Sequence, residues 1–387
     1  MAAVRAYLDY NASAPLLWQA REAVVAALDV AANPSSVHGE GRAARRLIED
    51  ARRQVAALAN AQPQHVVFTS GATEAATTLL TPQWRMGKAA LSFSHLYVCT
   101  ADHPCLRGGG RFPADQVTRI GVDRDGLLKL DELAAALAAH DKEQGLALVA
   151  VHAANNETGV VQSLEQIAAV VKAAGGVLVL DAVQAAGRVP LDMSKPCADY
   201  LILSAHKIGG PKGIGAIIAA ADLMMPTPLV TGGGQEKGHR GGTENLVGIA
   251  GFGAAASAAL EGLQTIDKIR ELRDRFEATL LELVPDAVIF GRAAPRLANT
   301  IFFAIPGLKA ETAQIAFDLA GVALSAGSAC SSGKVGASHV LTAMGFDEFQ
   351  GALRVSVGQA TDTQDLELFR SALAGIASRR SGGNRAA

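Results

Sequence analysis

Cysteine is scarce in this sequence, with four residues in a chain of 387. Cys99, Cys105, Cys197 and Cys330 show none of the paired spacings that zinc ligands have, and they are too few to hold a fold together by disulfide bonds. The pattern excludes a disulfide-rich secreted scaffold and a zinc-finger protein. We therefore expect a soluble protein of a reducing, cytoplasmic compartment, with no metal site.

Long apolar runs and an excess of charge of one sign are also missing. The N-terminus, MAAVRAYLDYNASAPLL, has no apolar run long enough for a signal peptide. No segment approaches the roughly 20 uninterrupted apolar residues of a membrane span. The formal net charge is −2 and the pI is about 6.5, so we expect neither a nucleic acid nor a membrane as partner.

Short apolar runs between residues 60 and 220 predict the strands of an α/β fold. Their continuous apolar character indicates a largely parallel sheet with helices on both faces. Helical patterns lie between them; one of these begins at a capping box of Ser163 and Gln166 and stops at Gly175. The predicted strands cover residues 65–69, 96–100, 146–152, 177–181, 200–204 and 215–220.

The pattern changes after residue 257. A charged helix over 266–283, strands near 299–304 and 353–357, and a last amphipathic helix predict a smaller α+β domain. That last helix has Leu366, Phe369, Leu373 and Ile376 on its apolar face. We predict a large domain over 13–257 and a small domain formed by 1–12 and 258–387, with a disordered tail over 379–387.

Chemically useful residues follow five of the predicted strands, where ligands bind in an open parallel sheet. SGATEA (70–75) opens a helix whose free N–H groups suit a phosphate, although a simple helix cap has the same pattern. NNETG (155–159) is either a turn or a source of hydrogen bonds to a ligand. His103 follows a third strand, where such a residue is either structural or stacks on a planar ring.

Two charged residues complete the set of strand ends. Asp181 closes a wholly apolar strand, which is costly unless it meets an arginine or a protonated ring nitrogen. Lys207 follows another buried strand, where it either forms an ion pair or serves as a neutral amine. Together these residues match pyridoxal phosphate, which needs a lysine for its aldehyde, an acid for its ring nitrogen and N–H donors for its phosphate.

The sequence resembles the cysteine desulfurases of the nitrogen-fixation and iron–sulfur-cluster type, which are fold-type I, class V aminotransferase-like enzymes. The resemblance covers roughly residues 6 to 360. The motifs that carry it occur in the family's order: YLDYNASAP, NPSSVHGEG, FTSGATEA, HAANNETGVVQ, LDAVQAAG, SAHKIGGPKGIG, GGGQEKGHRGGTEN, SAGSACSS and LRVSVG.

The resemblance implies a role for each matching residue. Lys207 holds the cofactor, Asp181 pairs with its ring nitrogen, and His103 stacks on the ring and helps to move protons. Arg354 binds the substrate carboxylate with Asn156 nearby, and Cys330 is the nucleophile that receives sulfur as a persulfide. The remaining cofactor contacts are Ala72, Thr73, Ser204 and His206 at the phosphate, Asn156 and Gln184 beside the ring hydroxyl, and Thr243 from the neighbouring subunit, which implies a homodimer.

The stretch SAGSACSSGKVGAS (325–338) holds Cys330 among small residues that suit a loop. We expect residues 330–337 to be poorly ordered, since the thiol must collect sulfur inside a cleft and pass it to an acceptor or scaffold protein outside. Cys105 near His103 also allows a Cys–His dyad, but a small apolar role fits it better. The rival functions are a selenocysteine lyase, another class V aminotransferase, and a sulfur-relay scaffold without catalysis.

Overall fold

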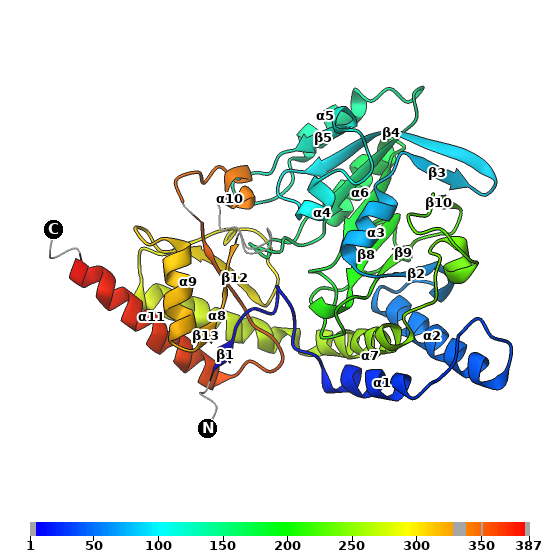
Figure 1. Cartoon of the computed structure of the whole chain (residues 1–387). Helices are drawn as coiled ribbons and strands as arrows, with labels where there is room; N and C mark the ends of the chain where they lie inside the picture. Colours follow the sequence, from blue (N-terminus) through cyan, green and yellow to red (C-terminus); the bar gives the residue numbers. More distant parts are fainter. Residues whose placement is uncertain (1–4, 328–337, 350, 384–387) are drawn as a thin grey trace.

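The computed structural model describes residues 5–327, 338–349 and 351–383. Within them, a nine-stranded sheet has the order β10-β3-β4-β6-β7-β8-β9-β2, and β5 pairs with β4 on the edge opposite β6 (Figure 1). Its strands are β2 (Val66–Thr69), β3 (Gln83–Met86), β4 (Ala89–Cys99), β5 (Val117–Ile120), β6 (Leu146–His152), β7 (Val177–Asp181), β8 (Tyr200–Ser204), β9 (Gly215–Ala219) and β10 (Met224–Pro226).

The six strands predicted between residues 60 and 220 are confirmed. The pairs β4–β5, β4–β6, β6–β7 and β7–β8 are parallel, and the pairs β3–β4, β8–β9 and β2–β9 are antiparallel. β4 is longer than predicted because its first half forms a hairpin with β3. β2 and β8 both pair antiparallel with β9, so β2 runs parallel to β8 and ends at the same edge of the sheet.

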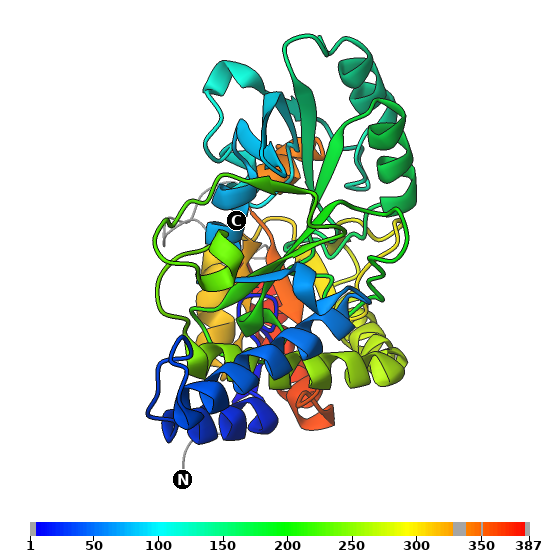
Figure 2. The same cartoon turned by 90° about the vertical axis from the view of Figure 1, so that its right-hand side faces the viewer.

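Helices cover both faces of this sheet, as the apolar strands require. The core on one face is shared with α2 (Gly39–Leu58), α5 (Leu130–Ala138), α6 (Leu164–Ala173) and α7 (Leu246–Gly262). The core on the other face is shared with α3 (Ala72–Leu79) and α4 (Pro104–Arg107). Figure 2 shows the blue and yellow-green helices α1 (Trp18–Leu28), α2 and α7 lying together below the green strands.

The helical stretch Leu246–Leu283 is long and apolar enough, by length and composition, to cross a membrane. It comprises α7 and α8 (Ile266–Leu283), joined by one turn of 3₁₀-helix. Phe252 of α7 is fully buried and its ring meets Phe68 of β2 edge-on. These contacts are those of a core helix packed against a sheet.

A second, four-stranded sheet has the order β11-β12-β15-β14. Its separate core joins the predicted helix 266–283, which is confirmed as α8, to the predicted last helix, whose four apolar residues are buried in α11. The N-terminal Ala6 and Leu8 belong to this core. The elements of this region are β1 (Ala6–Tyr7), β11 (Val288–Ile289), β12 (Thr300–Ala304), α9 (Ala310–Leu319), β13 (Val322–Ala323), β14 (Ser325–Ala326), α10 (His339–Ala343), β15 (Leu353–Ser356) and α11 (Thr363–Gly383).

Two local predictions are wrong. Residues 379–383 of the predicted disordered tail continue α11, which ends at Gly383, because the apolar stripe before them extends the helix. Ser163 makes no side-chain cap; its backbone carbonyl instead accepts from the N–H groups of Gln166 and Ile167. The predicted disorder of 330–337 and the thiol of Cys330 lie outside the described residues.

Candidate active site

The strand ends that carry the predicted residues meet around one cavity of about 530 Å³. β4, β6, β7 and β8 are neighbours in the sheet, so the turns that follow them lie side by side. The cavity brings together nine of the predicted site residues: Ala72, Thr73, His103, Asn156, Asp181, Gln184, Ser204, His206 and Lys207.

The phosphate end of this cavity is formed by Ser70, Gly71 and the first turn of α3. This turn approaches β9 so closely that a Cβ on Gly215 would lie 2.8 Å from the Gly71 Cα and 2.6 Å from the Leu203 carbonyl oxygen. Glycine at 215 therefore lets the α3 N-terminus sit over the sheet edge. The free N–H groups of such a helix start suit a phosphate.

Glu74 fixes the same turn from outside. Its carboxylate accepts hydrogen bonds from the Ser70 N–H at 2.8 Å and from Arg240 Nε at 3.2 Å. These bonds outweigh its partial burial and lower the pKa of Glu74. Thr243 lies close by, in a smaller hollow that also contains Ser70 and Gly213, rather than in the main cavity.

Lys207 lies in the single 3₁₀ turn Ala205–Lys207 that follows β8. Its Nζ donates hydrogen bonds to the backbone carbonyls of Asn11, at 2.7 Å, and Ala12, at 2.9 Å. These carbonyls come from the N-terminal segment, which the sequence analysis did not connect to the lysine. They hold the amine within the cavity that Asp181 and His103 also line.

Asp181 ends β7 and is 6% exposed. Its Oδ1 accepts a hydrogen bond from the Val183 N–H at 3.0 Å. Burial outweighs this bond and raises the pKa of Asp181 to about 6. A buried carboxyl group that lines a cavity is stabilised as an anion when a cationic group enters that cavity.

His103 is the N-cap of α4, and its Nδ1 accepts from the Cys105 backbone N–H at 3.3 Å. We infer from this bond that the proton of the neutral ring is on Nε2. Burial, together with the nearby Lys207 charge, lowers the pKa of His103 to about 4. The Cys105 Sγ lies 3.1 Å from the same Nδ1, but burial raises the pKa of its thiol well above the usual range, which argues against a thiolate–imidazolium dyad.

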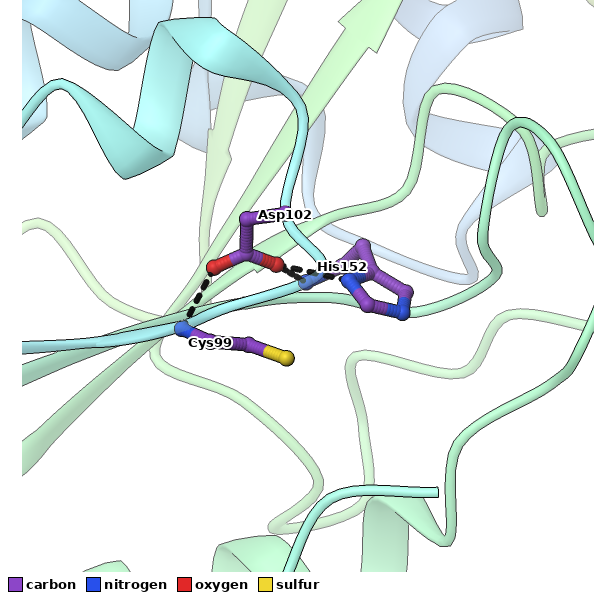
Figure 3. A group of neighbouring side chains, drawn as sticks. All are labelled: Cys99, Asp102 and His152. Atoms are coloured by element: carbon purple, nitrogen blue, oxygen red, sulfur yellow. Dashed lines mark hydrogen bonds and ion pairs between the residues drawn. The ribbon is translucent and has the colours of Figure 1, made fainter. Parts of the chain in front are cut away.

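A buried network holds the turn that presents His103 (Figure 3). The Asp102 carboxylate accepts from the backbone N–H groups of Cys99 and His152, and from His152 Nδ1 at 2.6 Å. His152 Nε2 lies 3.0 Å from Nε2 of Gln162, whose Oε1 accepts from the Leu128 N–H. Since that amide can only donate to the ring, Nδ1 carries the His152 proton.

This network also bears on metal binding. Possible ligand atoms of Cys99, Asp102 and His152 lie within 4.8 Å of one another. The Asp102 oxygens and both His152 nitrogens already have hydrogen-bond partners, and burial raises the pKa of the Cys99 thiol well above its usual range. The group therefore acts as a hydrogen-bonded tie between β4 and β6. Sequence reasoning missed it, because the motif HAANNETGVVQ contains His152 and Gln162 but does not show that Asp102 faces them.

Arg354 of β15 lies beside the cavity rather than in its wall, with its side chain 1% exposed. Its Nη2 lies 2.7 Å from Asp9 Oδ1, and its Nη1 donates to the backbone carbonyl of Asn156 at 2.8 Å. Among the described residues, its buried Nε has no hydrogen-bond partner. Asn156 thus contributes its carbonyl to the arginine and lines the cavity as well.

The residues present fit pyridoxal phosphate. The helix start at Gly71 suits its phosphate, Asp181 suits a protonated ring nitrogen, and Lys207 supplies an amine between them. The raised pKa of Asp181 supports this fit, because it shows that burial disfavours the ionised carboxylate. A protonated ring nitrogen next to Asp181 would stabilise that ionised form.

The chain belongs to the aminotransferase class-V family, whose model matches residues 6–369. A cysteine desulfurase of a Frankia species is 40% identical over 381 residues, which cover 93% of this chain and 88% of the relative. An IscS-like cysteine desulfurase of Mycobacterium tuberculosis is 33% identical over 383 residues, which cover 97% and 96%. The X-ray structure of a NifS-like protein from Rickettsia africae superposes with a TM-score of 0.86 at 30% identity, covering 97% of this chain and 99% of that one.

These relatives confirm the predicted family, the α/β fold and pyridoxal phosphate as the family's cofactor. The relatives are desulfurases, which supports the predicted cysteine desulfurase rather than the rival selenocysteine lyase or aminotransferase.

Proposed function

We propose that this chain converts L-cysteine to L-alanine with Cys330 as the sulfur acceptor, and that the predicted site residues have the roles given above. The observation that carries the proposal is the single cavity in which Lys207, Asp181 and His103 meet the α3 N-terminus. Pyridoxal phosphate, when bound, supplies an electron sink for the pair released as the substrate's Cα–H bond breaks.

The chain's own groups then handle the protons. Lys207 Nζ removes the α-proton, after leaving the carbonyls of Asn11 and Ala12 that hold it in the structure. His103 has a pKa of about 4 and is a neutral ring near pH 7, so its Nε2–H serves as a donor beside the substrate. His206, whose pKa burial also lowers to about 4, is a neutral donor for the phosphate.

The sulfur step joins two thiols. The Cys330 thiolate forms an S–S bond with the substrate sulfur while the substrate's C–S bond breaks. The electron pair of that C–S bond stays on Cβ, which takes up a proton. Cysteine plus the Cys330 thiol thus yield alanine plus a persulfide, and no external oxidant is needed.

The wider setting is also a proposal. Thr243 is exposed on the outer side of the phosphate turn, where it suits contact with a second copy, and we propose a homodimer on this basis. The core that Ala6 and Leu8 share with residues between 276 and 376 supports the proposed division into 13–257 and 1–12 with 258–387, whereas Phe290, Phe302 and Val340 pack into the core of the large sheet. We place the enzyme in the cytoplasm, where it passes sulfur to an acceptor or scaffold protein in iron–sulfur cluster assembly or thiolation.

The test compares wild type with Cys330→Ala, each loaded with pyridoxal phosphate and given L-cysteine. Wild type should form alanine and release sulfide under reductant, and the variant should lose both while it keeps the cofactor's absorbance. Wild type that forms no alanine would overturn the proposal. An aminotransferase would instead keep its turnover in the variant, and relative rates on cysteine and selenocysteine separate a desulfurase from a lyase.

A further inference from the structure

Glu157 is a buried acid that the proposed chemistry does not use. It lies in the turn after β6, is 2% exposed, and its N–H donates to Asn155 Oδ1 at 2.9 Å. Burial raises the pKa of Glu157 to about 7, against the Ser338 hydrogen bond and the Arg354 charge, which both lower it. Burial of a carboxyl group costs free energy, so we expect Glu157 to have a structural or functional role.

The carboxyl group of Glu157 contacts Gly327 and Ser338, the two residues that flank residues 328–337. On one side its Oε2 accepts the Ser338 hydroxyl at 2.6 Å. On the other side, a Cβ added to Gly327 would lie 2.8 Å from the same Oε2 and 2.6 Å from the ring of Phe302. One oxygen atom therefore lies against the residue before the segment and bonds to the residue after it.

Gly327 and Ser338 each form a further hydrogen bond that holds them in place. The Gly327 N–H donates to the Ala352 carbonyl at 2.8 Å, which continues the pairing of β14 with β15. Ser338 uses its hydroxyl twice, since Oγ also accepts from the Leu341 N–H and so caps α10. The next residue, His339, donates through Nε2 to the Asp102 carbonyl at 2.9 Å, one residue from His103.

We propose that Glu157 is a positioning residue for Cys330. The Glu157 carboxyl group holds Gly327 and Ser338 together at the β6 end of the cofactor cavity. The inference rests on the proposed function, in which Cys330 receives the sulfur. An ordinary helix cap explains why the Ser338 hydroxyl accepts a hydrogen bond from the Leu341 N–H. It does not explain why the same hydroxyl donates to the buried Glu157, because a cap needs the hydroxyl only as an acceptor. Because the Glu157 carboxyl group contacts Gly327 and bonds to Ser338, we expect its removal to lower the effective concentration of the Cys330 thiol at the substrate.

The experiment separates reactions that need the thiol from those that do not. L-Cysteine needs Cys330, whereas β-chloro-L-alanine loses chloride after α-proton removal and gives pyruvate without any thiol. Rates on both substrates, and the mass of the Cys330 peptide after a single turnover with L-cysteine, are measured for wild type, Glu157→Ala, Glu157→Gln and Ser338→Ala.

Glu157→Ala should lower kcat on L-cysteine and persulfide formation by about 10- to 100-fold, and pyruvate formation by no more than about twofold. Ser338→Ala should show the same split with a smaller loss. Glu157→Gln should recover most of the L-cysteine rate, because its amide oxygen still accepts from Ser338.

Leu280→Ala, in the core of the small domain, is the control for lost stability and should show no split between the two substrates. Equal losses on both substrates in Glu157→Ala, or no loss on either, would overturn the inference. Wild type without a persulfide on Cys330 would instead overturn the proposed function, so the two failures are distinguishable.

Discussion

The Arg354 guanidinium is held by the Asp9 carboxylate at 2.7 Å, although the two residues are 345 positions apart in the chain. The same arginine donates to the Asn156 carbonyl at the edge of the cofactor cavity. Asp9 also accepts from the Ser325 hydroxyl of β14, at 3.1 Å. One partly buried ion pair therefore joins the N-terminal segment, the second sheet and the turn after β6.

Arg354→Lys tests the proposed carboxylate contact. The lysine keeps the charge but loses the planar fork, so KM for L-cysteine should rise about tenfold or more, with a smaller change in kcat. Arg370→Lys is the matched control, since Arg370 forms a bidentate pair with Glu282 at the surface. Steady-state kinetics of both variants decide the point; an unchanged KM in Arg354→Lys contradicts the assignment.

The lowered pKa values of His103 and His206 predict acid sensitivity. Both pKa values are about 4 in the folded chain against 6.5 for an ordinary histidine, so the folded state binds these protons less tightly than the unfolded state. Their contribution to stability is fully present above pH 6.5 and is lost as the pH falls through 4.

His103→Gln should therefore flatten the decline in melting temperature of the cofactor-free protein between pH 7 and 4, by about 2 °C or more. His38→Gln is the control, because His38 is exposed at the N-cap of α2. If the melting temperature falls equally with pH in wild type and in His103→Gln, protonation of His103 does not contribute to the acid sensitivity, and the prediction is wrong.

Glu157 predicts the opposite pH dependence. Its pKa is raised from 4.5 to about 7, with Ser338 and Arg354 as the polar groups that face it. Its stabilising contribution is present below pH 4.5 and is lost as the pH rises through 7, because the buried group must ionise. The free energy of unfolding, measured with denaturant, should fall less from pH 5 to pH 8 in Glu157→Gln than in wild type. Equal falls in the two proteins would show that a group other than Glu157 causes the pH dependence.

Gly215→Ala tests the close approach under the phosphate turn. The added methyl group would collide with Gly71 Cα and the Leu203 carbonyl, so the α3 N-terminus must move. Overpacking of this kind costs about 1–3 kcal/mol, and we expect the Kd for pyridoxal phosphate to rise about tenfold. Gly375→Ala is the control, since a Cβ there meets nothing within 4 Å. Cofactor titration followed by absorbance gives both values, and an unchanged Kd in Gly215→Ala contradicts the prediction.

Much of the fold was predictable because the signals are local. Apolar runs such as 146–152 and 177–181 coincide with β6 and β7, and the charged pattern over 266–283 coincides with α8. Lys207 and Asp181 were predictable for a related reason: a charged residue directly after a buried strand must lie at the sheet edge, whatever the rest of the chain does.

The limits of prediction appear where a residue's state depends on distant neighbours. The end of α11 was misplaced because Gly and Ser near a terminus favour disorder locally, while packing of the preceding turns against α8 and α9 sustains the helix. Glu157 was visible only as part of NNETG, a turn motif. Its contact with Gly327 and Ser338 joins residues about 170 to 180 positions apart.

The sequence by itself determined the strands, the order of the motifs and the chemistry of the strand ends, because side-chain periodicity and residue type act over a few residues. Only the tertiary structure decided which group faces which: Asp9 with Arg354, Asp102 with His152, and Glu157 with Ser338. A buried polar group must be satisfied by whatever the packed chain brings within about 3 Å, and that neighbour is set by the whole fold.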